Sequence, residues 1–143
     1  ALYGALPDFV QKVAYFYHAS LQGCGAYPNA ARALRFASDA GVAQGLLADG
    51  QCFTAAQLAK ALGEGEPGFD PSMYLPADLR VLSHERKVKK PRPELFQAAV
   101  QALAKRGISP GEALHVGSSL ARDLGPAKKV GMRVALFAGD RHS

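Results

Sequence analysis

The 143-residue sequence contains only two cysteines, Cys24 and Cys52, and no apolar run long enough to cross a bilayer. A chain of this length buries roughly 70% of its unfolded surface without cross-links, so we expect two reduced thiols and no disulfide scaffold. The missing apolar run excludes a transmembrane helix. Residues 1–7 show no basic segment followed by an apolar one, which argues against a signal peptide there.

The sequence also lacks an initiator methionine, internal repeats and low-complexity segments. The missing methionine suggests a processed chain or a fragment of a longer protein. Hydrophobic residues make up 48% and charged residues 20%, which are the proportions of a globular domain. The net charge of +5 implies solubility and some attraction to anions.

Apolar residues that recur every three or four positions predict a series of helices. These helices cover residues 8–22, 28–40, 54–62, 93–106 and 120–130. Thr54 and Gln57 match a capping box, and Gly63 is the expected stop of that helix. Pro126 should lie near the start of its helix, because a proline deeper inside would cost about 3 kcal/mol.

Short apolar segments predict strands between these helices. They cover residues 45–48, 79–83, 113–117 and 133–137. Strands that alternate with helices indicate an α/β fold with a parallel sheet and right-handed crossovers. Ligands of such sheets gather at the carboxyl ends of the strands, so Asp49, residues 83–90 and residues 117–123 should converge there.

Two segments of the sequence carry recognisable motifs. Residues 89–96 read Lys-Lys-Pro-Arg-Pro-Glu-Leu-Phe, and residues 115–123 read His-Val-Gly-Ser-Ser-Leu-Ala-Arg-Asp. Together they resemble the second half of the haloacid dehalogenase superfamily, which has a lysine before Pro-x-Pro and then Val-Gly-Asp-Ser-x-x-x-Asp. The resemblance is continuous from residue 27 to residue 137, about three quarters of the chain.

The resemblance implies a three-layer, Rossmann-like α/β core built on a parallel sheet. It also implies that the sheet is incomplete, because the segment with the first family strand has no match in this sequence. Residues 1–27 would be the remnant of a helical cap or a linker, and residues 28–143 the C-terminal part of the core. The open inner edges of the sheet would then favour association with other polypeptide.

The family's chemistry can be assigned residue by residue. In the family, an aspartate after the first strand attacks the substrate, a hydroxyl and a lysine hold the phosphate, and carboxylates hold magnesium. Here the lysine matches Lys90 and the second acid matches Asp123. The first acid is replaced by Ser118, the hydroxyl position is Ala48, and the nucleophile has no counterpart.

The resemblance therefore implies a phosphatase-type, magnesium-dependent hydrolase of a small phosphorylated metabolite, located in the cytoplasm. For this chain we expect absent or severely weakened turnover and doubtful magnesium binding, since the attacking carboxylate and one metal ligand are missing. A pocket for an inorganic anion or a phosphate should remain. It would use Lys90, which is also the candidate catalytic residue, with Asp49, Ser118 and Ser119, and Asp123 as the candidate metal ligand.

Plainer roles stay open for several of these residues. Asp49 precedes a glycine and is typical of a turn, Asp123 is placed to start a helix, and Ser118 and Ser119 could cap it. A second reading is a non-catalytic interaction or regulatory module that keeps an anion pocket. The basic residues 86–92 lack interleaved aromatics, so a solvated loop is favoured over nucleic-acid binding.

Overall fold

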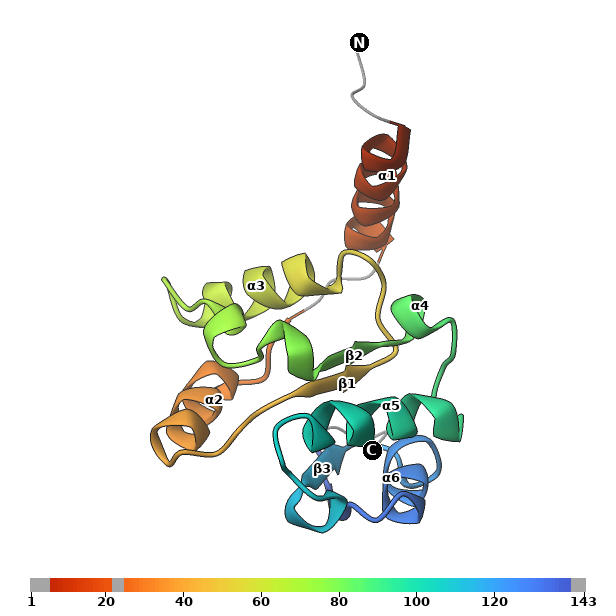
Figure 1. Cartoon of the computed structure of the whole chain (residues 1–143). Helices are drawn as coiled ribbons and strands as arrows, with labels where there is room; N and C mark the ends of the chain where they lie inside the picture. The colour runs from red at the N-terminus through yellow and green to blue at the C-terminus, as the bar shows by residue number, and fades with distance from the viewer. Residues whose placement is uncertain (1–5, 22–24, 140–143) are drawn as a thin grey trace. The chain divides into compact units, whose positions relative to one another are not determined.

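The computed structural model describes residues 6–21 and 25–139 of the chain (Figure 1). The chain forms two compact units. One contains residues 1–44 and 50–74, and the other contains residues 45–49 and 75–143. The boundaries of these units do not fall at residue 27, where the cap remnant was expected to end. The assignment of residues 1–27 to a cap remnant or linker stays a prediction.

The first unit is helical. Its elements are α1 (Leu6–Leu21), α2 (Ala30–Asp39), α3 (Thr54–Gly65) and a short 3-10 turn, η1 (Pro71–Met73). A small core of Ala31, Leu62 and Phe69 joins α2 to α3, and Tyr74 stacks on the Phe69 ring at a centroid distance of 4.7 Å. Gly41 has a φ of 73° just after α2, as expected of a helix stop.

The predicted start of the helix α3 at residue 54 is confirmed, but its predicted capping box and its predicted end are wrong. Thr54 lies inside the first turn, where its Oγ1 accepts a hydrogen bond from the Gln51 N–H at 2.7 Å instead of forming a capping box. The helix continues through Gly63 to Gly65. Buried Leu62 packs the last turns against the core of the first unit, and this packing outweighs the helix cost of a glycine, about 1 kcal/mol.

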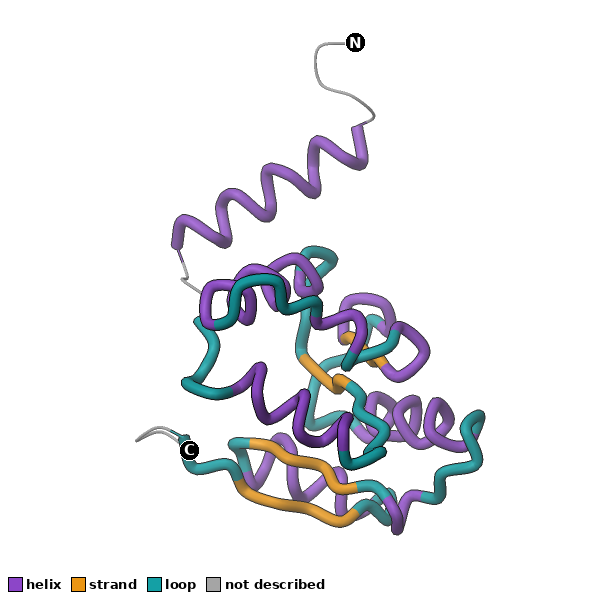
Figure 2. The backbone as a smooth tube through the Cα atoms, turned by 90° about the vertical axis from the view of Figure 1, so that its left-hand side faces the viewer, coloured by secondary structure: helices purple, strands orange, loops and turns teal. Residues whose placement is uncertain are grey.

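The second unit contains two pairs of parallel strands. Strand β1 (Leu46–Ala48) pairs with β2 (Arg80–Leu82), and β3 (Leu114–Gly117) pairs with β4 (Arg133–Leu136). Figure 2 shows the strands as short orange segments within a mostly helical tube. Among the described residues, the two pairs are not hydrogen-bonded to each other. This arrangement confirms the expected α/β class with parallel, incomplete pairing.

A helical layer covers these strands and supplies most of the core of the second unit. Its long helix is α5 (Pro93–Ala104), followed by α6 (Gly125–Lys129). The core consists of side chains from β2, α5, α6 and the start of the β4 segment, namely Val81, Leu95, Phe96, Ala98, Ala127 and Met132. Leu95, Phe96 and Ala127 are fully buried, so α5 and α6 are fixed against the strands.

Short turns complete the second unit and set the positions of its loops. They are η2 (Ala77–Leu79), α4 (Ser83–Arg86), η3 (Pro110–Glu112) and η4 (Leu120–Leu124). The helix predicted over residues 120–130 is instead a π-helical turn, η4, that leads into α6. Pro126 lies in the first turn of α6, as expected of a residue without an N–H.

The structure also bears on two features considered from the sequence, a membrane-spanning helix and the state of the cysteines. Over residues 6–21 and 25–139, no helix is both long and apolar enough to pass through a membrane. Cys52 is an exposed free thiol, while Cys24 lies outside the described residues.

Candidate functional site

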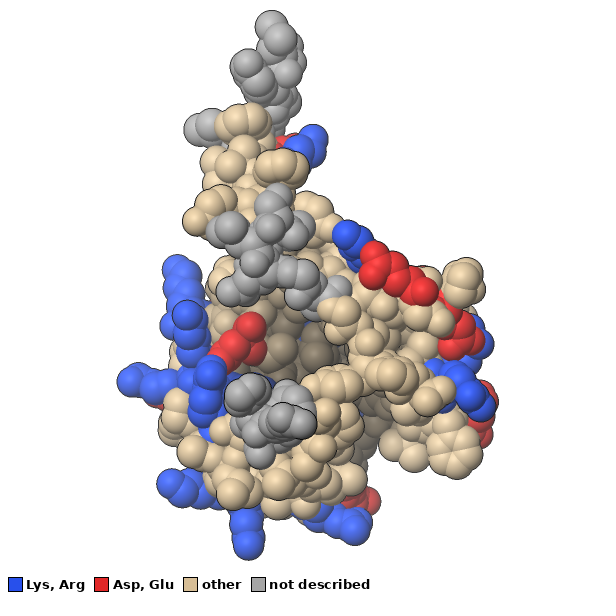
Figure 3. Space-filling model, turned by 180° about the vertical axis from the view of Figure 1, so that it is seen from behind, with Lys and Arg blue, Asp and Glu red and all other residues tan. Residues whose placement is uncertain are grey.

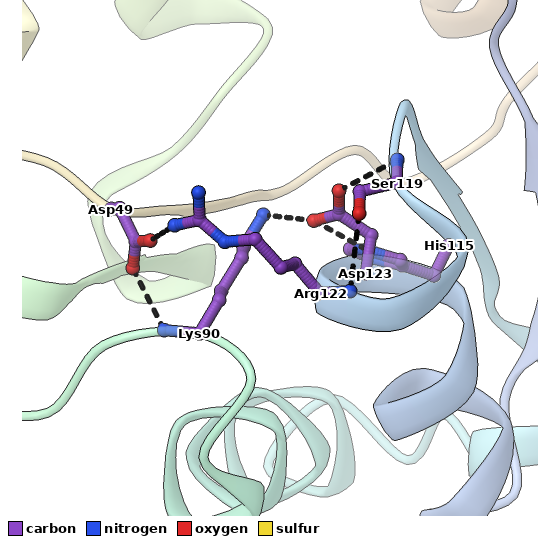
Figure 4. A network of polar contacts seen from close by, with 6 residues as sticks. All are labelled: Asp49, Lys90, His115, Ser119, Arg122 and Asp123. Carbon is purple, nitrogen blue, oxygen red and sulfur yellow. Dashed lines mark hydrogen bonds and ion pairs between the residues drawn. The ribbon is translucent and has the colours of Figure 1, made fainter. Parts of the chain in front are cut away.

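The carboxyl ends of the strands of the second unit bring three loops together. Asp49 follows β1, Lys90 lies in the loop after β2 and α4, and Asp123 lies in η4 after β3. Figure 4 shows their side chains pointing toward one another. The convergence expected from the strand order is confirmed for these three residues.

The most deeply buried ion pair of the site joins Lys90 to Asp123. The Lys90 Nζ lies 2.6 Å from Asp123 Oδ1, and the two side chains are 14% and 10% exposed. Burial by itself would raise the pKa of Asp123, but the hydrogen bond and the charge of Lys90 outweigh it, so the pKa lies below its ordinary value. Asp123 is therefore a carboxylate at neutral pH, and it neutralises Lys90.

The backbone around Asp123 fixes the second oxygen of this carboxylate. The Ser119 N–H donates to Asp123 Oδ2 at 3.1 Å. Gly117, at the end of β3, allows this close approach, because a Cβ on residue 117 would lie 2.4 Å from the Asp123 Cβ. A larger residue at position 117 would push the acid out of the site.

Asp49 links the other two loops. Its Oδ1 accepts a hydrogen bond from the Lys90 backbone N–H at 2.9 Å, and its Oδ2 accepts one from Arg122 Nη2 at 2.6 Å. Asp49 is 23% exposed and Arg122 is 60% exposed. The two cations and two carboxylates of the site therefore form two ion pairs whose charges balance.

His115 lies beneath the ion pair, on the face of β3 that packs on α5. Its ring meets the Phe96 ring edge-on at 5.6 Å, and its Nε2 lies 3.8 Å from Asp123 Oδ1, beyond hydrogen-bond range. Among the described residues this buried nitrogen has no hydrogen-bond partner. Burial, and then the charge of Lys90, lower the pKa of His115 in spite of the attraction of Asp123. The imidazole is therefore neutral at neutral pH.

The two serines differ in their surroundings. Ser119 caps η4, with its Oγ accepting from the Arg122 N–H at 3.2 Å, which is the plainer of the two roles considered for it. Ser118 is exposed and takes no part in the described contacts of the site. The proposed anion-binding roles of both serines stay predictions.

The residues of the site fit a magnesium ion poorly. Asp123 is the only carboxylate from the predicted metal positions, and its two oxygens are already engaged by Lys90 and Ser119. In the described part of the chain, no group of three or more His, Cys, Asp or Glu side chains could hold a metal ion. Ser118, at the position of the other acid, supplies a neutral hydroxyl, which is a weaker ligand for a hard cation.

Sequence reasoning missed the contribution of His115 and assigned Arg122 no partner. His115 could have been found from the alternation of β3, because residues 115 and 117 share a face and Gly117 contacts Asp123. The pairing of Arg122 with Asp49 joins residues 73 positions apart, and no local pattern in the sequence predicts it.

Comparison with known proteins gives three findings. A family model for haloacid dehalogenase-like hydrolases matches residues 3–131. The crystal structure of a HAD phosphatase from Thermococcus onnurineus is similar, with a TM-score of 0.63 and 30% identity over 81% of this chain and 49% of that one. The Rhythmically expressed gene 2 protein of Drosophila melanogaster is 34% identical over 59 residues, 41% of this chain and 23% of that protein. The chain thus spans less than half the length of either protein.

Proposed function

The chain belongs to the haloacid dehalogenase-like hydrolases, and from that premise we propose that its second unit is the phosphate-holding part of a phosphatase-type site. The observation that carries this proposal is the ion pair of Lys90 and Asp123 at the carboxyl ends of the strands. The lysine is an anion ligand in a mostly buried position, where a charged hydrogen bond is stronger than in water.

Lys90 would bind phosphate by exchanging one anionic partner for another. In the structure its ammonium group donates to a carboxylate oxygen of Asp123. A phosphate oxygen can take the place of the Asp123 oxygen on the ammonium group, which has three N–H donors. Because Asp123 keeps its hydrogen bond from Ser119, it stays in place while Lys90 turns toward the phosphate.

For this chain alone, we propose that hydrolysis is absent or severely weakened. The sequence contains no Asp-x-Asp segment, so no carboxylate matches the family's nucleophile. Without that group there is no covalent step, and the loss of rate is close to complete. Asp123 would contribute one ligand to a magnesium ion, which supplies charge stabilisation in the family, but the described residues do not form a metal site by themselves.

The ligand we propose is a small phosphorylated metabolite or an inorganic anion, bound in the cytoplasm without metal. We propose that the chain has no membrane partner and that nucleic acid is not its ligand. Figure 3 shows the face of the molecule opposite to that in Figure 1. Lys and Arg side chains gather along the left side of this view and are scattered over the rest. Such a distribution supports a general attraction to anions more than a continuous nucleic-acid track.

A non-catalytic interaction or regulatory module is the second candidate. It is favoured by Ser118, which replaces an acid and lies exposed outside the network of the site. The substitutions Ser118→Asp and Ala48→Ser in the full-length protein separate the two candidates. Recovery of phosphatase turnover would support a decayed enzyme, and a lack of recovery would support the module.

Titration of inorganic phosphate by calorimetry, with EDTA present, tests the phosphate-holding role. We expect saturable binding by the natural chain, loss of binding in Lys90→Met, and unchanged binding in Lys128→Met, whose lysine is exposed on α6. The double variant Lys90→Met/Asp123→Asn serves if the single variant fails to fold, because it removes the unpaired carboxylate. Binding that requires magnesium, or that survives loss of Lys90, would contradict the proposal.

Turnover of p-nitrophenyl phosphate with magnesium tests the proposed inactivity separately. We expect a rate equal to that of buffer alone. A rate typical of enzymes, on the order of 1 per second or more, would show that other residues of the chain supply a nucleophile.

A further inference from the structure

Arg122 precedes Asp123 in η4, and its side chain also extends toward the loop that contains Lys90. Figure 4 shows its side chain extending past the Lys90 ammonium group to Asp49. Its Nη2 donates to Asp49 Oδ2 at 2.6 Å, while Oδ1 of the same carboxylate accepts from the Lys90 N–H at 2.9 Å. The Asp49 carboxylate thus bridges the guanidinium group of Arg122 and the backbone N–H of Lys90.

The two ion pairs of the site differ in how easily they open. The pair of Lys90 and Asp123 is mostly buried, with exposed fractions of 14% and 10%, whereas Arg122 is 60% exposed. An exposed ion pair contributes little stability, because water and salt screen it. A dissolved anion can therefore replace Asp49 on Arg122 at little cost.

The guanidinium group can hold an anion with two donors. Arginine presents parallel N–H donors in a plane, and they bind two oxygens of a carboxylate or of a phosphate. In the structure Asp49 accepts a hydrogen bond from Nη2 of this group, so a carboxylate now occupies the position. Asp49 acts as an internal stand-in for a carboxylate of a ligand.

We propose that Arg122 receives the carboxylate of a small phosphorylated acid whose phosphate is held by Lys90. The inference rests on the proposed phosphate-holding role of Lys90 and adds the substrate class. A ligand with a phosphate and a carboxylate a few bonds apart satisfies both cations at once. A phosphorylated alcohol satisfies only Lys90, so the site discriminates between the two classes.

A matched pair of ligands tests this proposal by calorimetry. The pair is 3-phosphoglycerate and glycerol 3-phosphate, which share a three-carbon skeleton and differ in a carboxylate against a hydroxymethyl group. We expect the natural chain to prefer the acid by about tenfold, which corresponds to one extra charged contact. In Arg122→Gln the ratio of the two affinities should fall to about one.

Arg106→Gln is the control for a general change of charge. Arg106 forms an ion pair with Asp78 in the same unit, with two contacts of 2.7 Å, and it lies outside the network of the site. This variant should keep the preference of the natural chain. Asp49→Asn should increase the preference, because it frees Arg122 and keeps an oxygen for the Lys90 N–H.

The possible outcomes separate this inference from the proposed function. Equal affinities of the natural chain for the two ligands, or a ratio that Arg122→Gln leaves unchanged, would overturn the role of Arg122 while phosphate binding through Lys90 stands. A fall of the ratio in Arg106→Gln as large as that in Arg122→Gln would also overturn it, because net charge alone would then explain the preference. Loss of binding of both ligands in Lys90→Met, with the ratio dependent on Arg122, supports both proposals.

Discussion

At the scale of single residues, the geometry of the site depends on a glycine, which contributes no side chain to it. Gly117 ends β3, and any Cβ there would lie 2.4 Å from the Asp123 Cβ and 2.8 Å from its Cγ. Asp123 is 7% exposed and cannot move outward without leaving the Ser119 N–H and the Lys90 ammonium. The precise placement of the acid is therefore a property of residue 117 as much as of residue 123.

Gly117→Ala should destabilise the chain by about 1–3 kcal/mol, because the added methyl overpacks the contact with Asp123. Gly111→Ala is the matched control in the same unit, since no atom lies within 4 Å of the Cβ it would add. Its effect should stay within about 0.5 kcal/mol. Urea denaturation of the three proteins measures both effects, and equal midpoints would contradict the account of Gly117.

His115 should make stability depend on pH just below neutrality. Its folded-state pKa is lowered by burial and by Lys90, so the unfolded chain binds a proton at a higher pH than the folded chain does. Stability should therefore fall as the pH drops below about 6.5, the ordinary pKa of histidine. Asp123, whose pKa is also lowered, contributes stability above about pH 4, which is lost only in stronger acid.

His115→Gln removes the titrating group and should flatten the dependence of stability on pH just below about pH 6.5, the ordinary pKa of histidine. The measurement is the midpoint of urea denaturation at several pH values for the natural chain and the variant. The same slope in both proteins would assign the effect to another group.

At the scale of elements, α5 connects the core to the site. Phe96 is fully buried in the core of the second unit, and its ring also supports His115 edge-on. Leu95, its neighbour, is equally buried. One helix thus holds the strands together and fixes the floor beneath the ion pair.

Phe96→Ala should lower the free energy of unfolding by about 3–5 kcal/mol, through lost burial and the cavity that remains. Gln97→Ala, on the exposed side of the same helix, should change it by less than about 0.5 kcal/mol. Chemical denaturation compares the variants. A small effect of Phe96→Ala would mean that α5 does not carry the core.

Most elements could be predicted because their signals are local. Pro93 and Gly107 mark the limits of α5, and Gly107 has the expected positive φ of 72°. The capping box of Ser109 and Glu112, whose residues are three positions apart, is another such local signal. The C-terminal limit of α3 was wrong because buried Leu62 decides it by tertiary packing, and no local pattern predicted the π-helical form of η4.

Within the site, the sequence predicted which loops meet but not which atoms pair. The placement of Lys90 near Asp123 followed from strand order and from the family motif, and the structure confirms their proximity. The contacts of Asp49 with Lys90 and Arg122 depend on side-chain directions set by the fold. Such long-range pairings leave no periodic trace in a single sequence.

At the scale of the whole molecule, the two strand pairs of the second unit leave backbone groups available for further pairing. Among the described residues, β3 pairs only with β4, and its side chains Leu114 and Val116 are 56% and 57% exposed. Apolar side chains beside an open strand edge favour association with other polypeptide.

The natural chain should therefore associate with itself as its concentration rises. Val116→Lys should reduce this association, because a lysine beside the edge of β3 would be buried by a docked strand. Sedimentation velocity over a range of concentrations compares the two, with Lys128→Met as a surface control. A monomer at every concentration would contradict the expectation.

The central claim is that Asp123 forms an ion pair with Lys90 at the position that an anionic ligand would take. Asp123→Asn removes the competing charge and keeps the shape, so without metal it should bind inorganic phosphate about tenfold more tightly than the natural chain, a difference of about 1.4 kcal/mol. Asp78→Asn, which alters an ion pair outside the site, should leave the affinity unchanged. Phosphate titration in EDTA decides the matter: tighter binding only in Asp123→Asn is the predicted result, and unchanged or weaker binding in that variant would contradict the claim.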